Sequence, residues 1–597
     1  MLRPIVTVIL IVTVHIAHGG ERELNPDILL KQQQILLERQ INQQEIQKRI
    51  ENSPSTLEIQ QSESNEVLIQ NQQQCFKLTE ISFINAKLLS KREQDKLTKP
   101  FVGKCITLDT IQHIMRQTTN YYTKRGYITS RAFINPQDIT TGKLEVVIVE
   151  GKIDEIEFEG QNNQLPNQFP IGIHKGAIDG FLSQTQIISA FGGIKERRLN
   201  IKDIERGLEQ LNRLSSNNAT MQIVPSQQEE YSKIIISKNI KDKTTRLRLG
   251  LNNAGQQQTG MYNGKVIFEQ ENLAKINDSI MVVFTHDIDG DYSSKKSQNI
   301  YANINIPFGK WNVSTALVES SYLSTINGTN TTFKVSGKSS IQTYKLERKI
   351  FRNAKNRISV FSSMNLKNTQ SFIEDALNDV GSRRLSVLST GFNHNIISKL
   401  GYFDYTLARL QGLNNFGAKS DSAITNDFTP MAQYEKYIID INYYKNFNIG
   451  NQKFFVTSNI NGQYSQNPLF ASEQIIIGDQ YSVRGFRAKS ALGDDGMFIQ
   501  NNINYTMPAF LTDKLNINSV IKKTEIFAGY DYGYVRQKGG TTASFGQGKA
   551  ILSGVAIGTR FKGKIAQFDI TYAHTLKTED FIPSGWEIYG NLTVRLW

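Results

Sequence analysis

The sequence predicts a mainly β protein, in which a 16-stranded transmembrane β-barrel follows two α+β domains and an N-terminal helix. From about residue 244 to residue 597, segments of roughly ten residues alternate apolar and polar side chains, as strands of membrane barrels do. Beyond the first residues, no apolar stretch approaches the roughly 20 residues that a membrane-spanning helix needs. Because only helices and closed barrels satisfy the backbone in lipid, we expect the chain to cross a membrane with strands.

Residues 1–19 have the features of a secretory signal peptide. Arg3 supplies a positive charge, residues 5–16 are apolar, and Ala17 and Gly19 offer small side chains at a cleavage point. A membrane anchor is the alternative, but the apolar run is shorter than a bilayer requires. We therefore expect an exported protein.

Residues 25–50 are expected to form a helix. Asn25 can cap its start, Pro26 suits the first helical position, and a thin apolar stripe runs along a Gln-rich body. Such a helix is too polar for a packed core. It either lies in a water-filled channel, as a plug of the pore, or forms a solvated arm, and the polar residues 51–74 then read as a linker.

Export also bears on the two cysteines, Cys75 and Cys105. An oxidising compartment favours a disulfide between them, and two cysteines alone cannot form a structural zinc site. The formal net charge of +13 is compatible with a nucleic-acid partner. Lys and Arg are spread along the chain, however, so basic loops that face anionic lipid or a client chain explain the charge as well. We expect no metal site and no nucleic acid.

Two successive modules, residues 75–151 and 152–240, share a plan of strand, helix, strand and strand. The helix of the first module is expected to begin at Leu108 and to end before Gly126. The strands of the first module are expected at 76–83, 127–134 and 144–149. The second module is expected to contain a strand at 153–158, a helix at 201–214, and strands at 221–224 and 233–240.

Residues 244–597 divide into sixteen alternating segments, which predicts the barrel. The segments are 244–253, 260–270, 278–289, 299–308, 311–324, 331–351, 356–373, 383–398, 401–413, 433–448, 452–465, 496–510, 524–537, 551–562, 565–574 and 586–597. Connections after even segments are mostly short, whereas those after odd segments are longer and reach 466–495. A soluble β-sandwich or solenoid does not explain why short and long connections alternate. A membrane barrel does, because it has short inner turns and long outer loops.

The longest loop, 466–495, contains an Arg between apolar residues and glycine, in the run Val483, Arg484, Gly485 and Phe486. In segment 524–537, alternation directs one set of side chains into the lumen; this set is Phe527, Gly529, Asp531 and Gly533. An inward-folded loop could bring Arg484 to Asp531, since a guanidinium matches a carboxylate. By spacing alone this is one Arg and one Asp among many.

These motifs resemble the TpsB family of two-partner secretion transporters, relatives of outer-membrane insertases with periplasmic POTRA domains. The loop and the barrel-wall residues named above match the motifs of the wider superfamily. Within that superfamily, residues that resemble the POTRA domains of TpsB proteins favour the TpsB family. These residues are Tyr122, Gly126, Tyr127, Arg131, Pro136, Gln137, Asp138 and Gly151 in the first module, and Glu205, Leu208, Asn212 and Arg213 in the second.

The resemblance implies a transporter in the outer membrane of a Gram-negative bacterium, with its POTRA domains in the periplasm and the helix at 25–50 plugging the pore at rest. The partner would be an unfolded secreted exoprotein that carries an N-terminal secretion domain: a haemolysin, an adhesin, a contact-dependent toxin or a haem-scavenging protein. The expected surroundings are outer-membrane lipid, lipopolysaccharide and the barrel assembly machinery. The resemblance implies neither a cofactor nor an enzymatic activity.

Two features depart from the family pattern. Pro225 is followed by Ser226 where the family usually has Pro-Gly. Trp597 is terminal, but Leu592 and Val594 lie on the opposite phase, so either Trp597 sits near the membrane interface or the expected register is wrong by one residue.

Three other functions are alternatives to secretion. A passive porin leaves the two soluble modules without a role. An insertase would be expected to carry more POTRA repeats and no helix in its pore. A hydrolase is not supported, because the sequence contains neither a nucleophile elbow nor a metal-binding His-Glu-x-x-His motif.

Overall fold

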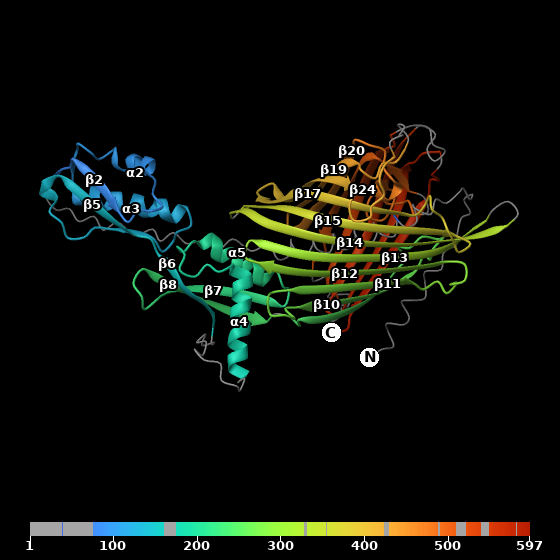
Figure 1. The fold of residues 1–597 in the computed structure, drawn as a ribbon, viewed down its shortest axis with the longest axis horizontal. Coiled ribbons are helices and arrows are strands. Elements are labelled where there is room, and N and C mark those ends of the chain that lie inside the picture. The colour runs from blue at the N-terminus through green and yellow to red at the C-terminus, as the bar shows by residue number, and fades with distance from the viewer. Residues whose placement is uncertain are drawn as a thin grey trace.

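The computed structural model is elongated, with a small domain at one end, a second domain beside it and a barrel beyond (Figure 1). It describes Lys31, Arg39 and residues 76–159, 175–240, 242–327, 331–353, 355–422, 429–487, 490–508, 521–538, 548–580 and 582–597. The predicted signal peptide (1–19) and linker (51–74) lie outside the described residues. So does the predicted helix 25–50, except for Lys31 and Arg39, whose backbones are helical.

The first domain, residues 76–151, is a three-stranded sheet in the order β2-β5-β4, with helices packed on it. Its elements are β1 (Phe76–Lys77), β2 (Glu80–Ile84), α2 (Lys91–Thr98), β3 (Cys105–Ile106), α3 (Leu108–Lys124), β4 (Arg131–Phe133), η1 (Ile139–Thr141) and β5 (Lys143–Val149). Leu144, Val146 and Ile148 alternate into one core with Ile111 and Ile114 of α3. Gly126 follows α3 with φ +97°, a conformation that ends a helix at little cost only for glycine.

The predicted secondary structure of this domain needs three corrections. The expected strand 76–83 is two strands, because Thr79 and Glu80 both donate to the carbonyl of Gly142 where the chain changes partner. The expected strand 127–134 shortens to β4, since a turn in which Ser130 N donates to Tyr127 O precedes it. Helix α2 was not predicted at all.

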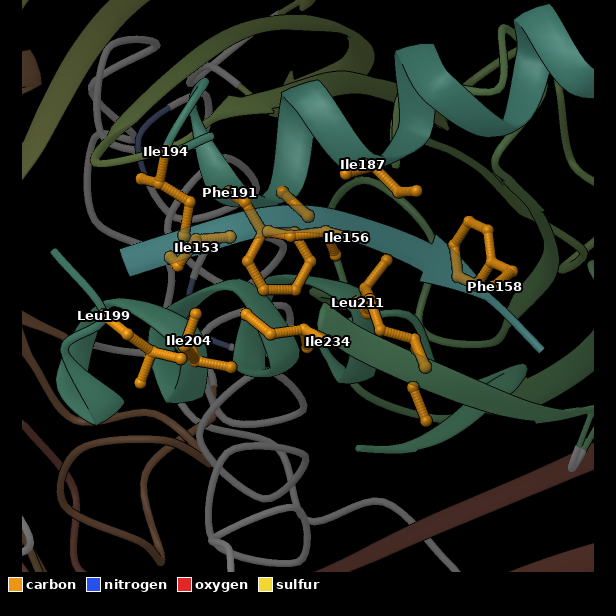
Figure 2. Close-up of a cluster of buried hydrophobic side chains, with 13 residues drawn as sticks. Ile153, Ile156, Phe158, Ile187, Phe191, Ile194, Leu199, Ile204, Leu211 and Ile234 are labelled. Atoms are coloured by element: carbon orange, nitrogen blue, oxygen red, sulfur yellow. The ribbon is translucent and has the colours of Figure 1, made fainter. Parts of the chain in front are cut away.

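The second domain, residues 152–240, packs two helices against the sheet β6-β8-β7. Its elements are β6 (Lys152–Phe158), α4 (Lys175–Phe191), α5 (Ile201–Asn212), β7 (Asn217–Pro225) and β8 (Tyr231–Ile240). Figure 2 shows Phe191 of α4 among the apolar side chains of β6 and α5. A Cβ on Gly207 would lie 2.1 Å from the Phe191 ring, so this glycine lets α4 and α5 pack closely. Helix α4 was not predicted.

The barrel contains the sixteen predicted strands and closes on itself, which confirms the predicted fold class. Its strands are β9 (Thr245–Asn252), β10 (Asn263–Glu271), β11 (Ser279–Asp287), β12 (Lys296–Phe308), β13 (Trp311–Asn327), β14 (Thr332–Arg352), β15 (Asn356–Ile373), β17 (Arg383–Ser398), β18 (Gly401–Leu413), β19 (Glu435–Ile449), β20 (Gln452–Ser465), β23 (Asp495–Thr506), β24 (Ile521–Arg536), β25 (Lys549–Gly563), β26 (Ala566–Lys577) and β27 (Trp586–Arg595). A two-residue strand, β16 (Ala376–Leu377), pairs with the end of β15. Every long strand is antiparallel to its neighbours, and β27 pairs with β9.

The two faces of the barrel wall differ in polarity, as alternation requires. On β10, Val266 and Phe268 are exposed outside, whereas Lys265 and Glu269 lie inside and are buried. Exposed apolar side chains recur on the outer face of β12, as at Ile304. An outer surface of this kind suits the hydrocarbon region of a bilayer.

In the last strand, Leu592 and Val594 face outward, and Trp597 is not part of the strand. Leu592 and Val594 lie directly opposite Leu251 and Leu249, which are exposed on the outer face. Strand β27 ends at Arg595, and the carbonyl of Trp597, beyond it, accepts a hydrogen bond from Leu247 at 3.1 Å. Trp597 therefore lies past the end of the strand.

The second domain docks on one end of the barrel, the domain end, through α4 and α5 (Figure 1). The amide nitrogen of Asn277, in the turn between β10 and β11, donates to the Gln186 carbonyl at 2.8 Å and to Ser189 Oγ at 2.6 Å. The backbone N–H of Gly309, in the turn between β12 and β13, donates to the Ser189 carbonyl at 2.7 Å. A Cβ on Gly309 would meet Gly192 Cα at 2.9 Å, so the two backbones approach closely.

Cys105, the first residue of β3, is disulfide-bonded, whereas Cys75 lies outside the described residues. We propose that the bond joins these two residues, because the chain has two cysteines and Phe76 pairs with Ile106.

Non-reducing peptide mapping should recover Cys75 linked to Cys105; two free thiols would contradict this. Replacing both with Ser should lower the stability of the first domain by about 3 kcal/mol, because it opens a loop of roughly 30 residues.

Candidate functional site

The connection between β20 and β23 is called the sixth loop, and its described residues, 466–487 and 490–494, fold into the lumen from the barrel end opposite the second domain. It contains the short helix η2 (Ala471–Glu473) and a hairpin of β21 (Ile475–Ile477) and β22 (Ala491–Gly493). Its apolar side chains join one buried cluster with the barrel wall. The wall residues of that cluster are Phe498, Val535, Ala550 and Leu552. Burial against inward-facing residues places the loop inside the barrel.

The tip of the sixth loop is held by an ion pair between Arg484 and Asp531 of β24. Arg484 Nε lies 2.6 Å from Asp531 Oδ2, and Nη2 lies 2.7 Å from Oδ1. The backbone N–H of Arg484 also donates to Oδ2 at 3.0 Å. Arg484 is 4% exposed and Asp531 0% exposed. A guanidinium that donates through two nitrogens to one carboxylate is a strong, geometrically specific contact.

Glycines on both sides make room for this contact. A Cβ on Gly529 would lie 2.3 Å from Arg484 Nη2, and one on Gly554 would lie 2.2 Å from the Arg484 carbonyl oxygen. A Cβ on Gly533 would meet Val483 Cγ2 at 2.8 Å. Gly485 has φ +99°, which lets the tip turn directly after the arginine.

Aromatic and amide side chains complete the site. The Phe527 ring lies 5.7 Å from the Arg484 guanidinium and 4.3 Å from that of Arg560, within the range of cation–π contacts. Asn502 Oδ1 accepts from Arg484 Nη1 at 2.8 Å, and the Tyr589 hydroxyl accepts from Gly485 N at 3.3 Å.

Three residues of the site were not predicted from the sequence: Asn502, Tyr589 and Gly554. Alternation along each strand predicts which side chains point inward, and this signal was available for Asn502. The cross-strand register, which sets Asn502 opposite Gly529, was not available from one sequence. Phe486, which was predicted, is 3% exposed and lies in the apolar cluster of the sixth loop.

The two described residues of the N-terminal segment also contact the sixth loop. Lys31 Nζ donates to the Ser472 carbonyl at 2.6 Å. Arg39 Nη1 lies 2.5 Å from Asp479 Oδ2, and its guanidinium lies 4.7 Å from the Phe498 ring of the wall. Both cations therefore lie in the lumen beside the loop.

The predicted residues of the first domain organise its junction with the second domain. The Tyr122 hydroxyl donates to Glu150 Oε1 at 3.0 Å, and Arg198 of the second domain pairs with the same carboxylate. Burial, together with the Glu150 carboxylate, raises the pKa of Tyr122 well above its ordinary range. The Gly126 carbonyl accepts from Ile201 N at 2.8 Å. The junction is thus held by a buried polar network.

Glycine and tyrosine complete this junction. A Cβ on Gly151 would lie 2.3 Å from Thr129 Oγ1, so no side chain fits at the point where the chain enters the second domain. The Tyr127 ring stands edge-on to Tyr122, with 6.4 Å between their centroids.

The remaining predicted residues of the first domain shape the connection from β4 to β5. Gln137 Oε1 accepts from Glu145 N at 2.8 Å, and Asp138 Oδ1 accepts from Thr140 N at 2.9 Å at the start of η1. Pro136 and Arg131 are exposed, the latter at the start of the edge strand β4.

The predicted residues of the second domain divide between docking and packing. Arg352, at the end of β14, pairs with Glu205 and lies 2.7 Å from Glu209 Oε1. Burial opposes ionisation of Glu209, but its hydrogen bond to Arg352 and the positive charges of Arg357, Arg352 and Lys349 together outweigh that effect, so the pKa of Glu209 is lowered. Arg213 Nη2 donates to the Asn277 carbonyl at 2.5 Å. Glu205 and Arg213 therefore fasten the domain to the barrel.

Asn212 and Leu208 act inside the second domain. Asn212 Oδ1 accepts from Ala219 N at 2.6 Å, and its amide nitrogen donates back to the Ala219 carbonyl at 2.9 Å. This joins the end of α5 to β7. Leu208 packs against the core of the domain.

The described residues contain no group of three or more His, Cys, Asp or Glu side chains placed to hold a metal ion. Among the same residues, no helix has both the length and the apolar character to cross a membrane.

Deleting residues 25–50 tests whether the N-terminal segment occupies the lumen. The deletion removes Lys31 and Arg39 from the sixth loop, so the conductance of single channels in planar lipid bilayers should rise. Deleting the predicted linker, residues 51–74, which is of similar length, serves as the control. Equal conductance of the full chain and the 25–50 deletion would contradict the placement.

Comparison with known proteins identifies the family. The family model described as Haemolysin secretion/activation protein ShlB/FhaC/HecB matches residues 230–561. A ShlB-type POTRA domain matches residues 76–151, and a further POTRA domain matches residues 152–225.

Among curated relatives, an outer membrane transporter, CdiB of Dickeya dadantii (strain 3937), is 29% identical over 435 residues, which are 72% of each chain. The hemolysin transporter protein HpmB of Proteus mirabilis is 24% identical over 79% of this chain and 78% of its own. The solved structure of CdiB from Escherichia coli has a TM-score of 0.80 at 24% identity, and the match covers 97% of this chain and 100% of that one. That likeness concerns the fold.

The family model covers more than half of the chain, and it matches the same barrel whose lumen holds the sixth loop. The first and second domains are its two POTRA domains. The chain therefore belongs to the ShlB/FhaC/HecB family of haemolysin secretion/activation proteins, and it is an outer-membrane two-partner secretion transporter of the TpsB type with its POTRA domains in the periplasm.

Proposed function

We propose that this transporter captures an unfolded exoprotein on its POTRA domains and passes it as an extended chain through the barrel to the cell surface. The observation that carries the proposal is the sixth loop, which the buried Arg484–Asp531 pair holds inside the lumen. A barrel of sixteen strands is wide enough for an aqueous channel, and an extended strand measures about 5 by 10 Å across. The loop and the N-terminal segment then act as the removable contents of that channel.

The POTRA domains offer sheet edges on which an extended client could add a strand. In the first domain, β2 and β4 are the edges of the sheet, and each carries an exposed apolar residue, Ile84 and Phe133. Backbone hydrogen bonds along such an edge give affinity that depends little on client sequence, which suits an unfolded chain. The second domain, fastened to the periplasmic end of the barrel, leads from these edges to the lumen.

Folding of the client outside the cell is the proposed driving force. Once apolar surface of the client is buried in a folded structure, return through a narrow lumen is opposed by the cost of exposing that surface again. This mechanism needs no nucleotide and no enzymatic step. The client is proposed to carry an N-terminal secretion domain that the POTRA domains recognise.

Arg484→Ala should strongly reduce secretion while leaving a folded barrel in the membrane. The variant leaves Asp531 buried without its partner, a loss that is worth about 3–5 kcal/mol in comparable pairs, so secretion should fall roughly tenfold or more. Secreted client is measured in the culture medium, and heat-modifiable migration in gels reports barrel folding. Arg409→Ala removes an ion pair with Glu435 on the outer surface and should leave secretion unchanged. Normal secretion by Arg484→Ala would contradict the role of the pair.

A photo-crosslinking residue at position 84 or 133 should capture the client during secretion. The same residue at position 96, which is exposed on α2 and outside the sheet, is the matched control. Client crosslinks at the edge positions and none at position 96 are expected. Crosslinking at position 96 alone would place capture elsewhere.

A further inference from the structure

Glu473, the last residue of η2, is a second buried charge of the sixth loop, and it was not predicted from the sequence. It is 1% exposed inside the lumen. Lys367 Nζ of β15 lies 2.5 Å from Glu473 Oε1, and Lys436 Nζ of β19 lies 3.2 Å from Oε2. The hydroxyl of Tyr434, which is itself fully buried, donates to Oε2 at 2.5 Å. Both carboxylate oxygens are therefore engaged by the barrel wall.

The backbone at the same residue is also held. Its carbonyl accepts from Lys436 Nζ at 2.7 Å and from Gln463 Nε2 of β20 at 3.0 Å. Glu473 thus joins the first limb of the loop, which is the part before its tip at Arg484, to β15, β19 and β20. Arg484 joins the tip of the loop to a different sector, which includes β23 and β24.

A carboxylate with these contacts favours one position of the loop over others. In the lumen its charge is balanced by two cations, and it would have to lose both of them together to move away. Removing one partner of a buried charge pair strongly destabilises a protein, because the other charge stays desolvated and unpaired. Intermediate positions of the limb are therefore disfavoured, and release is expected to occur as one step.

The N-terminal segment contacts the loop just before Glu473 and again between Glu473 and Arg484. Lys31 Nζ donates to the carbonyl of Ser472, the residue before Glu473. Arg39 Nη2 donates to the Ile476 carbonyl at 3.0 Å, and Arg39 pairs with Asp479. The first limb therefore lies between cations of the wall and cations of the N-terminal segment.

We propose that Glu473 is a positioning residue of the transporter: it forms a second attachment point of the sixth loop, on β15 and β19, that keeps the lumen closed at rest together with the Arg484–Asp531 pair. This inference rests on the proposed passage of client through the barrel. Opening of the lumen then requires two charged contacts on two wall sectors to be released, and departure of Lys31 and Arg39 frees the limb for that release.

The test compares two neighbouring carboxylates in the full chain. Glu473→Gln keeps the shape of the side chain and removes its charge. Glu435→Gln does the same one residue before Lys436, where the carboxylate pairs with Arg409 on the outer surface. The fraction of time that single channels stay open is measured in planar bilayers without client, after gel migration has established that each barrel is folded. Glu473→Gln should raise this fraction by roughly tenfold or more, and Glu435→Gln should leave it within about twofold of the unmodified chain.

Lys436→Met removes the partner of Glu473 on the wall. It keeps the test informative if Glu473→Gln does not fold. It should also raise the open fraction, and the double variant should open no more often than Glu473→Gln alone, because Glu473→Gln already removes the charged contact with Lys436. Open fractions of both single variants equal to that of Glu435→Gln would overturn the inference.

Secretion in cells is measured separately, so that the two proposals can fail independently. If the unmodified chain secretes no client while Glu473→Gln still opens the channel, the proposed function fails and the attachment point stands. If the chain secretes client while Glu473→Gln and Lys436→Met behave like the control, the attachment point fails alone.

Discussion

An arginine whose charge is buried inside a protein needs a partner in a fixed place. Arg484 is 4% exposed, and its guanidinium nitrogens and its backbone N–H all find acceptors on the barrel wall, most of them on Asp531. Replacing such a pair by apolar residues can be neutral, but breaking it leaves one charge without water and without a partner. The position of the whole sixth loop depends on this asymmetry, because the loop can leave only by exposing both charges together.

The surrounding fold supplies what the pair needs. Glycines at positions 529 and 554 let the arginine approach the wall to a distance that any Cβ would prevent. Inward-facing apolar residues of β23 to β25 cover the hairpin of the loop and keep water from the pair. At the periplasmic end, Arg352 and Arg213 fasten the second POTRA domain to the same barrel.

Much of this architecture was predictable from periodicity, since a strand that separates lipid from water must alternate. That rule located the sixteen strands and placed Asp531 inside. It could not place Arg484, because a contact across 47 positions depends on how a loop folds. It also missed helix α2, which has no buried residue and thus no apolar stripe, and helix α4, which packs against the sheet on one side and the barrel turns on another. Glu473 resembled any polar loop residue, since only its neighbours in space make it distinctive.

A disulfide crosslink in intact outer membranes tests the inward position of the loop tip most directly. A side chain at position 533 would touch Val483, so cysteines at 483 and 533 should form a bond in nearly every molecule under mild oxidation. Cysteines at 483 and 534 are the control, because Tyr534 belongs to the outward-facing phase of the same strand. A bond at 533 and none at 534 is the expected result. Absence of the 483–533 bond in folded barrels would contradict the account.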